Sequence, residues 1–363
     1  MSESLNKNRV IFLDLLRAAA ILLLLFSVNI EHTLGEEYRK GGTVLLQGWV
    51  YLNSVVIPLF IFTSGTLFMY LYKTQNLPFR ENEMVKRGLK RGITLLTIGY
   101  ALQLPWYRWL SAGGEVVPAG WDSFVIVDIL QLLGMSMLLM VLLLFISEKS
   151  GLKNYQLFGL AALVLLASGL LFEHSGIAEK LPPALQAWFT QVGGSKYPLF
   201  HFGFYFLAGN CAGCFIYNHP EAFESVQNAR MLLVAGVGLI AISFLGELLL
   251  TSLGINERIA DKVVIKVFRK TGLIILGLIV VIHTSIVLKE NPKIFILLAR
   301  NTLLLYVVNV VLIERTPLKE YFMKIYGPVE SIVMAAGMTA FMVLFVIIYN
   351  KLNFKNFSMM RGG

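Results

Sequence analysis

The first hydrophobic segment of the chain, residues 9–32, contains polar residues whose types and spacing suit a reactive site. Asp14 and Arg17 lie three residues apart in its first half, and Asn29 and His32 lie three residues apart at its end. Residues at this spacing share one face of a helix. An ionisable side chain inside a membrane helix costs about 2.5–3.5 kcal/mol on insertion scales, so it faces a partner, a cavity or water. The segment therefore predicts either a functional site or a structural ion pair between Asp14 and Arg17.

His32 is the strongest candidate for a general base, because a neutral imidazole is the usual proton acceptor near physiological pH. Acidic side chains expected at the same depth, Asp128 and Glu247, could orient it or set its protonation. The alternatives are that His201 is the base, or that His32 is only an interfacial polar residue. Three amide side chains at this depth could donate hydrogen bonds to a tetrahedral oxyanion: Asn29, Asn53 and Asn309.

A second polar layer is expected at the opposite end of the helices. It adjoins the most basic stretch of the chain, residues 80–91, whose cations recur at helical spacing and could hold phosphate oxygens through charge-assisted hydrogen bonds. The same stretch could equally be an anchor beside anionic lipid. Two polar layers, one toward each membrane surface, suit a protein that binds one molecule from each side of the membrane. The cationic and polar candidates of the inner layer are Asp14, Arg17, Ser64, Lys86, Arg87, Lys90, Arg91 and Arg300.

The elements that position these residues are membrane helices. The 363 residues are 56% hydrophobic and 15% charged, with a mean hydropathy of +0.70, whereas about 25% of the residues of a soluble domain are charged. The sequence predicts an all-α, polytopic bundle of about ten transmembrane helices in a single domain, residues 1–363. The expected spans are 10–30, 48–72, 92–104, 123–146, 156–172, 198–217, 231–251, 271–288, 295–313 and 328–350.

The distribution of Lys and Arg predicts that both termini are cytoplasmic, because basic residues gather in the tails and loops on that side. The basic loop 252–270 falls on the opposite side, and we expect its IADKVVIKVF portion to form an amphipathic surface helix. The net charge of +9 is typical of such loop bias. No nucleic acid is expected as a partner, because no soluble basic domain is present.

Two further patterns leave alternatives open. Pro58 precedes a group of small residues, Thr63 to Gly65, which indicates either close helix packing or a break that admits a ligand. Cys211 and Cys214 form a CAGC sequence inside an apolar run, where small packing residues are expected rather than a redox pair. The five His and two Cys residues show no spacing typical of metal ligands, so no metal is expected.

The order of several apolar blocks resembles the transmembrane acyltransferase superfamily, specifically its heparan-alpha-glucosaminide N-acetyltransferase-like branch, with acyltransferase-3 proteins as more distant relatives. The blocks are FLDLLRAAAILLLLFSVN, IPLFIFTSG, KRGLKRGITLLTIGY, VDILQLLGMSMLL, KYPLFHFGFYFLAGNCAG and RNTLLLYVVNVVL. Relatives have an essential His early in the chain. His32 is the candidate here, although Asn29 lies nearer the usual position. Where relatives commonly read Tyr-x-x-His, this chain has Tyr306 and Asn309.

The resemblance implies an acyl-CoA-dependent enzyme that takes an acyl group, usually acetyl, at the cytoplasmic face and delivers it to a sugar or glycolipid on the other side. A non-enzymatic transporter or lipid flippase is the alternative, with Asp14, Arg17 and Glu247 along an ion or substrate path. The expected partners are the lipid bilayer, acyl-CoA, a glycan or glycolipid acceptor and, as an open alternative, further copies of the chain in a homo-oligomer. The protein is expected in a membrane, the cell (inner) membrane if its source is bacterial.

Overall fold

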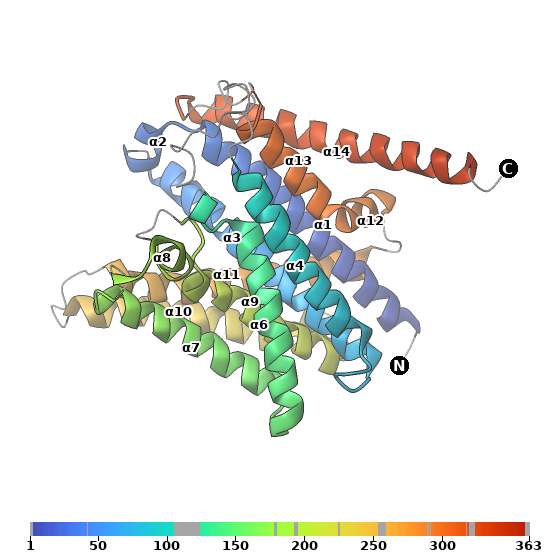
Figure 1. Cartoon of the computed structure of the whole chain (residues 1–363), viewed down its shortest axis with the longest axis horizontal. Coiled ribbons are helices and arrows are strands. Elements are labelled where there is room, and N and C mark those ends of the chain that lie inside the picture. The colour runs from blue at the N-terminus through green and yellow to red at the C-terminus, as the bar shows by residue number, and fades with distance from the viewer. Residues whose placement is uncertain are drawn as a thin grey trace. The chain divides into compact units, whose positions relative to one another are not determined.

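The computed structural model describes residues 3–41, 43–104, 124–177, 180–191, 195–223, 226–252, 259–288, 290, 292–316, 318 and 324–359 (Figure 1). Within these ranges the regular elements are helices, with one isolated bridge between Leu34 and Tyr326. The all-α prediction is confirmed. The chain separates into two compact units: unit 1 contains Met1–Leu5 and Ile61–His283, and unit 2 contains Asn6–Phe60 and Thr284–Gly363. The single domain expected from the sequence stays a prediction.

The protein is an integral membrane protein, because eight helices within the described ranges are long and apolar enough to cross a bilayer. A ninth span would come from a bent pair of helices, α12 (Lys293–Arg300) and α13 (Thr302–Glu314). The number is therefore eight to nine rather than about ten. The difference lies in α4 (Glu83–Gln103), whose first half contains the basic stretch, so that too little of the helix is apolar.

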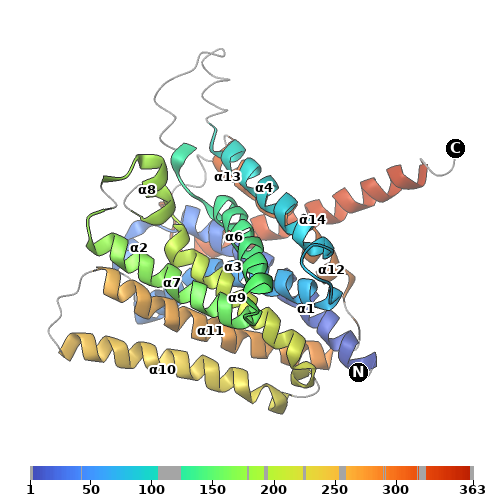
Figure 2. The same ribbon diagram turned by 60° about the horizontal axis from the view of Figure 1, so that its bottom comes forward.

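In unit 1, α4 runs beside α6, and α7 runs beside α9, as both ribbon views show (Figures 1 and 2). The helix α10 lies beside α11. Each pair buries one face of each helix, and the outward faces of α7 and α10 remain apolar and exposed, as lipid contact requires. Besides α4, the described helices of unit 1 are the later part of α3 (Val44–Gln75), α6 (Ile129–Ser150), α7 (Asn154–His174), α8 (Pro183–Phe189), α9 (Leu199–Asn218), α10 (Arg230–Ser252) and α11 (Ile259–Val287). Short 3-10 turns lie at Pro220–Phe223 and Val226–Ala229.

Glycines bring α3 and α9 into close contact within unit 1. A Cβ atom on Gly65 would overlap the backbone carbonyl of Phe206, and one on Gly209 would overlap that of Phe62. Small residues at such positions let membrane helices approach closely. The packing interpretation of the small-residue group is therefore supported, and α3 continues through Pro58 as one helix. Cys211 and Cys214, beside these glycines, are free thiols.

The basic loop before the eighth expected span differs from the sequence-based prediction. Its IADKVVIKVF portion is the first part of α11, a continuous helix that extends to Val287. It is therefore not a separate surface helix. The physical reason is that no Pro or Gly interrupts residues 259–271, so the helix continues into the span, where Arg269 pairs with Glu247 of α10.

Unit 2 is built from α1 (Glu3–Thr33), α2 (Glu36–Gly41), the first part of α3, the bent pair α12 and α13, and α14 (Pro328–Met359). The single span expected over 295–313 is broken, because α12 and α13 meet at an angle of 68°. The short helix α12 ends at Arg300, and Asn301 occupies the break. A small core of Ile30, Leu34 and Ala335 joins α1 to α14.

Candidate active site

The candidate site is centred on the last two turns of α1, which contact α13 within unit 2. Asn29 donates from Nδ2 to the carbonyl of Leu25 at 2.7 Å and to Oδ1 of Asn309 at 3.4 Å. Both asparagine side chains are fully buried. The structure thus brings together two of the three amides that the sequence placed at one depth, through residues 280 positions apart.

His32 lies one turn beyond Asn29 and faces a carboxylate. Its Nε2 is 3.4 Å from Oε1 of Glu314, the last residue of α13. The side chains of His32 and Glu314 are 24% and 26% exposed, so the pair is accessible but partly shielded. A histidine held by a carboxylate on one nitrogen has its other nitrogen available for proton transfer. The pair can therefore serve acyl-transfer chemistry.

Glu314 was not predicted as a site residue, because only acidic residues inside the expected spans were candidates. The ninth expected span ended at residue 313. The signal that could have found Glu314 is its position five residues after Asn309, just past the end of the apolar run. A carboxylate at a helix end can reach the interface and still pair with a neighbouring helix. Glu314, rather than Asp128 or Glu247, is the carboxylate that the structure shows against His32.

Backbone contacts hold the turn of α1 that contains His32. Arg39 of α2 donates from Nη2 to the carbonyl of Glu31 at 2.6 Å, which satisfies an acceptor that the end of the helix leaves open. Thr33 donates to the carbonyl of Asn29 at 2.9 Å. The backbone of Tyr326 bonds on both sides of Leu34, with Gly35 N to Tyr326 O at 3.0 Å and Tyr326 N to Thr33 O at 3.1 Å. The end of α1 is therefore held by a side chain of α2, by a hydroxyl of its own last turn and by the backbone of Tyr326.

The third amide, Asn53, contributes through its backbone. Its carbonyl accepts a hydrogen bond from Ser27 at 3.5 Å, which ties the first part of α3 to α1. Its side chain is half-buried. Asn53 therefore belongs to the same unit as the pair of asparagines, and its oxyanion role stays a prediction.

Asp128, expected inside a span, instead caps the N-terminus of α6. Its carboxylate accepts from the backbone of Ile129 at 2.8 Å, and its own backbone N–H donates to Gln131 at 3.3 Å. This reciprocal arrangement is a capping box, which satisfies the open donors of a helix start. The span begins one residue later than Asp128, so the carboxylate does not lie within the apolar segment.

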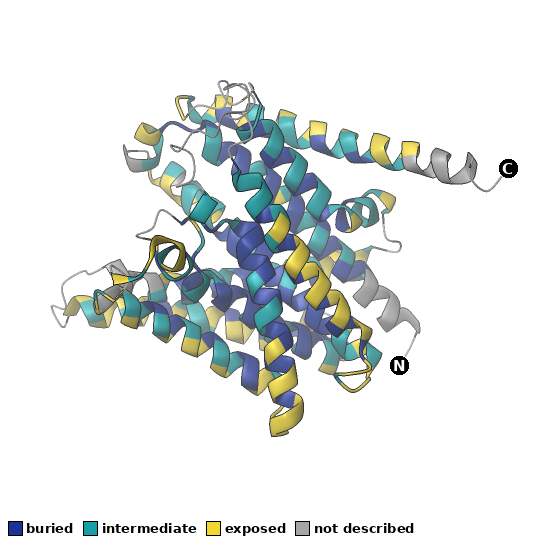
Figure 3. Ribbon diagram, viewed as in Figure 1, coloured by how far each residue is buried: buried dark blue, intermediate teal, exposed yellow. Residues whose placement is uncertain are grey.

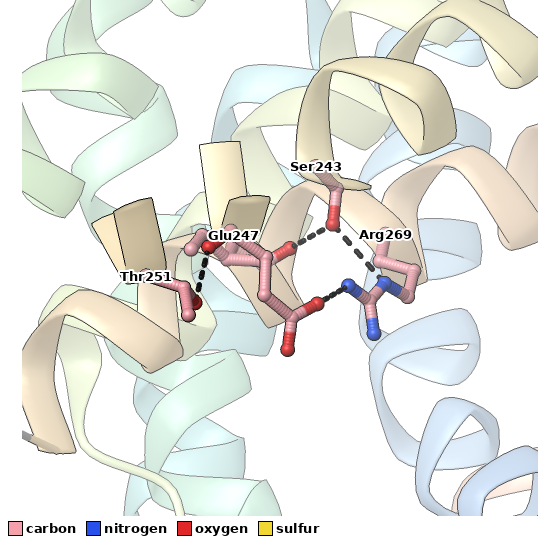
Figure 4. A network of polar contacts seen from close by, with 5 residues as sticks. Ser243, Glu247, Thr251 and Arg269 are labelled. Carbon is pink, nitrogen blue, oxygen red and sulfur yellow. Dashed lines mark hydrogen bonds and ion pairs between the residues drawn. The ribbon is translucent and has the colours of Figure 1, made fainter. Parts of the chain in front are cut away.

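Glu247 is engaged in a different network, between α10 and α11 (Figure 4). Its carboxylate forms an ion pair with Arg269, which also donates from Nε to Oγ of Ser243 at 3.1 Å and stacks on Phe244 with 4.1 Å to the ring centroid. The side chain of Glu247 is 49% exposed and that of Arg269 18%. This network joins two helices, and it gives Glu247 a structural partner.

His201 and Ser64 both lie in unit 1. His201 is buried near the start of α9, and a Cβ atom on Gly169 of α7 would lie 2.9 Å from its Nε2. The imidazole therefore packs directly against α7. Ser64 is half-buried in α3, next to the glycine that contacts α9.

The inner candidates divide between the two units. In unit 2, Asp14 and Arg17 are half-buried one turn apart on α1, with interacting charges, and Arg300 is exposed at the end of α12. In unit 1, α4 buries one face against α6 and exposes its cations on the other, where exposed residues appear yellow in Figure 3. The exposed cations are Lys86, Arg87, Lys90 and Arg91, of which Arg87 also pairs with Glu83 at 2.7 Å.

Comparison with known proteins adds a decisive observation. A family model described as "Heparan-alpha-glucosaminide N-acetyltransferase, catalytic" matches residues 9–246 of the 363. The chain belongs to this family. Heparan-alpha-glucosaminide N-acetyltransferase catalytic domains imply an acetyl-CoA-dependent N-acetyltransferase, and this chain is such an enzyme in a multi-span helical form. Comparison with curated proteins finds no match.

The family match covers α1, with Asn29 and His32, and also α4, but it ends before α13. Asn309 and Glu314 therefore lie beyond the matched range, and only the structure places them against α1. No cluster of three or more His, Cys, Asp or Glu residues suited to a metal ion is found among the described residues.

Proposed function

We propose that this family member moves an acetyl group from acetyl-CoA on the cytoplasmic side of the membrane to the amino group of a sugar or glycolipid on the other side. The observation that carries the proposal is the approach of His32 to Glu314, one turn from the paired amides of Asn29 and Asn309. A base, its carboxylate partner and two buried amides at the junction of two membrane helices suit acyl transfer.

In the proposed reaction Glu314 accepts a hydrogen bond from Nε2–H of His32, which leaves Nδ1 as the basic nitrogen. The acceptor amine attacks the thioester carbonyl and forms the new N–C bond while His32 removes a proton from the amine. The C–S bond then breaks, and CoA leaves as the thiol after taking up that proton. If His32 instead accepts the acetyl group first, the same nitrogen carries it.

The phosphates of the donor need cationic partners, and the exposed face of α4 supplies them. Lys86, Lys90 and Arg91 lie along one side of the helix and are open to solvent. Arg gives bidentate contacts to phosphate and Lys gives a point charge. We assign this face to the CoA phosphates.

The proposal is tested with the purified chain in sealed proteoliposomes. Acetyl-CoA labelled in its acetyl group is supplied on one side only, and an amino-sugar acceptor is enclosed on the other. We expect labelled N-acetyl product inside the vesicles and free CoA outside. Movement of the acceptor across the membrane without acetylation would instead identify a transporter.

A further inference from the structure

Hydrogen bonds fix the orientation of both buried amides. The carbonyl of Leu25 can only accept, so the nitrogen of Asn29 faces it at 2.7 Å, and the oxygen of Asn309 then faces that same nitrogen at 3.4 Å. Oδ1 of Asn29 and Nδ2 of Asn309 have no hydrogen-bond partner, although both side chains are fully buried. The pair is therefore left with one acceptor and one donor.

One acceptor beside one donor is complementary to a secondary amide, which offers one N–H and one C=O. We propose that Asn29 and Asn309 bind the amide of acetyl-CoA that lies nearest the thioester, Asn29 Oδ1 accepting from its N–H and Asn309 Nδ2 donating to its carbonyl. Buried polar groups without partners are unfavourable, and a bound amide would satisfy both. This inference rests on the proposed function, because it names residues for the same donor.

The spacing along α1 agrees with this assignment. His32 is three residues beyond Asn29, which places it on the same face about 4.5 Å further along the axis. In acetyl-CoA two methylene groups separate this amide nitrogen from the sulfur of the thioester. A donor whose amide lies level with Asn29 therefore brings its thioester about level with His32. The flexible arm of acetyl-CoA, which contains this amide, would approach from the end of α1 that contains Arg17.

An oxyanion role, expected from the sequence, fits the pair less well. A tetrahedral oxyanion needs hydrogen-bond donors, and an acceptor aimed at it is repulsive. Both donors of Asn29 are already used, by Leu25 and Asn309, and its remaining group is an acceptor. Amide binding uses both remaining groups, whereas oxyanion binding uses only one.

The arm can reach the pair only if α1 and α13 separate slightly. The helix α13 begins at the 68° bend beside Asn301, and element ends of this kind absorb hinge motions. Its other end carries Glu314. Movement of α13 would therefore admit the arm and then return the carboxylate to His32.

The test compares acetyl-CoA with an analogue in which this amide N–H is replaced by an ester oxygen. The full purified chain is used, and kcat/KM is measured from release of the free thiol. We expect the wild type to prefer acetyl-CoA by about tenfold, because the ester leaves Oδ1 of Asn29 without a donor. This comparison needs no variant, so a folding defect cannot obscure it.

Variants then separate the two contacts. Asn29→Leu should reduce the preference to about one, because the acceptor is gone. Asn309→Leu should raise KM for both donors by about tenfold and keep the preference, because both donors have the carbonyl. Thr339→Val, which removes a hydroxyl bonded to the carbonyl of Ala335 within α14 of the same unit, is the control and should keep both the preference and KM. A wild type without preference, or Asn29→Leu with the full preference, would overturn this inference alone. Absence of thiol release by the wild type would overturn the proposed function with it.

Discussion

At the residue scale, the chemistry of the site depends on which carboxylate faces His32. Oε1 of Glu314 lies 3.4 Å from Nε2 of His32, whereas Glu247 forms an ion pair with Arg269. A carboxylate that holds one imidazole nitrogen fixes the ring and stabilises the imidazolium that forms during proton transfer. The two glutamates therefore have different partners, and substitutions can test whether their roles differ as well.

Glu314→Gln should lower kcat by at least about tenfold with little change in KM for acetyl-CoA, because the ring of His32 loses its anionic partner but the donor keeps its contacts. Glu247→Gln is the matched control. It removes the partner of Arg269 in unit 1 and leaves His32 and Glu314 intact, so it should leave kcat unchanged. Steady-state kinetics of both variants measure this. Equal activity of Glu314→Gln and the wild type would remove Glu314 from the mechanism.

At the element scale, unit 1 depends on the close approach of α3 and α9. Gly65 and Gly209 meet the carbonyls of Phe206 and Phe62, so neither position has room for a side chain. Membrane helices lack a hydrophobic driving force between them and rely on such packing. The contact is therefore a sensitive point for stability.

Gly209→Ala should destabilise the protein by about 1–3 kcal/mol, because the new methyl group overlaps the carbonyl of Phe62 and the helices must move apart. Gly159→Ala is the control. Nothing lies within 4 Å of the position where its Cβ would be, in the second turn of α7, so the change should be neutral or stabilising by up to about 1 kcal/mol. Thermal unfolding in detergent compares the two. A Gly209→Ala variant as stable as the wild type would show that α3 and α9 do not pack so closely.

The elements also show how far the sequence predicts this molecule. Apolar runs predicted the helices because hydropathy and length are local properties. The break between α12 and α13 was missed, because residues 295–313 read as one apolar run in which only Arg300 and Asn301 interrupt the pattern. Asp128 was placed inside a span because its capping role depends on where α6 begins.

The site was predictable to a similar extent. The types of Asn29, His32 and Asn309 identified them as candidates, and the structure brings Asn29 and Asn309 together. The partner of His32 could not be predicted, because pairing between α1 and α13 is a long-range contact that no local pattern encodes. The ion pair between Glu247 and Arg269 likewise depends on tertiary packing and could not be predicted.

At the scale of the whole molecule, the proposed transfer across the membrane requires a defined orientation of the chain. We predict that both termini and the stretch 80–91 are cytoplasmic, since Lys and Arg concentrate in loops on that side. Single cysteines are introduced in a background that lacks Cys211 and Cys214. Lys86→Cys should react with an impermeant thiol reagent only after the membrane is opened, whereas Glu37→Cys, exposed on α2, should react in intact cells. The reverse pattern would place the CoA phosphates on the wrong side.

The proposed acetyl-transfer chemistry depends on His32, and thiol release from acetyl-CoA by purified variants measures that dependence most directly. His32→Ala should lower kcat by about 100-fold to 10,000-fold and leave KM for acetyl-CoA nearly unchanged. His219→Ala is the matched control, because His219 also pairs with a carboxylate, Glu221 at 2.7 Å, but at an exposed site in the other unit. It should retain full activity. Full activity of His32→Ala in the same assay would show that His32 is not the base or the acetyl carrier.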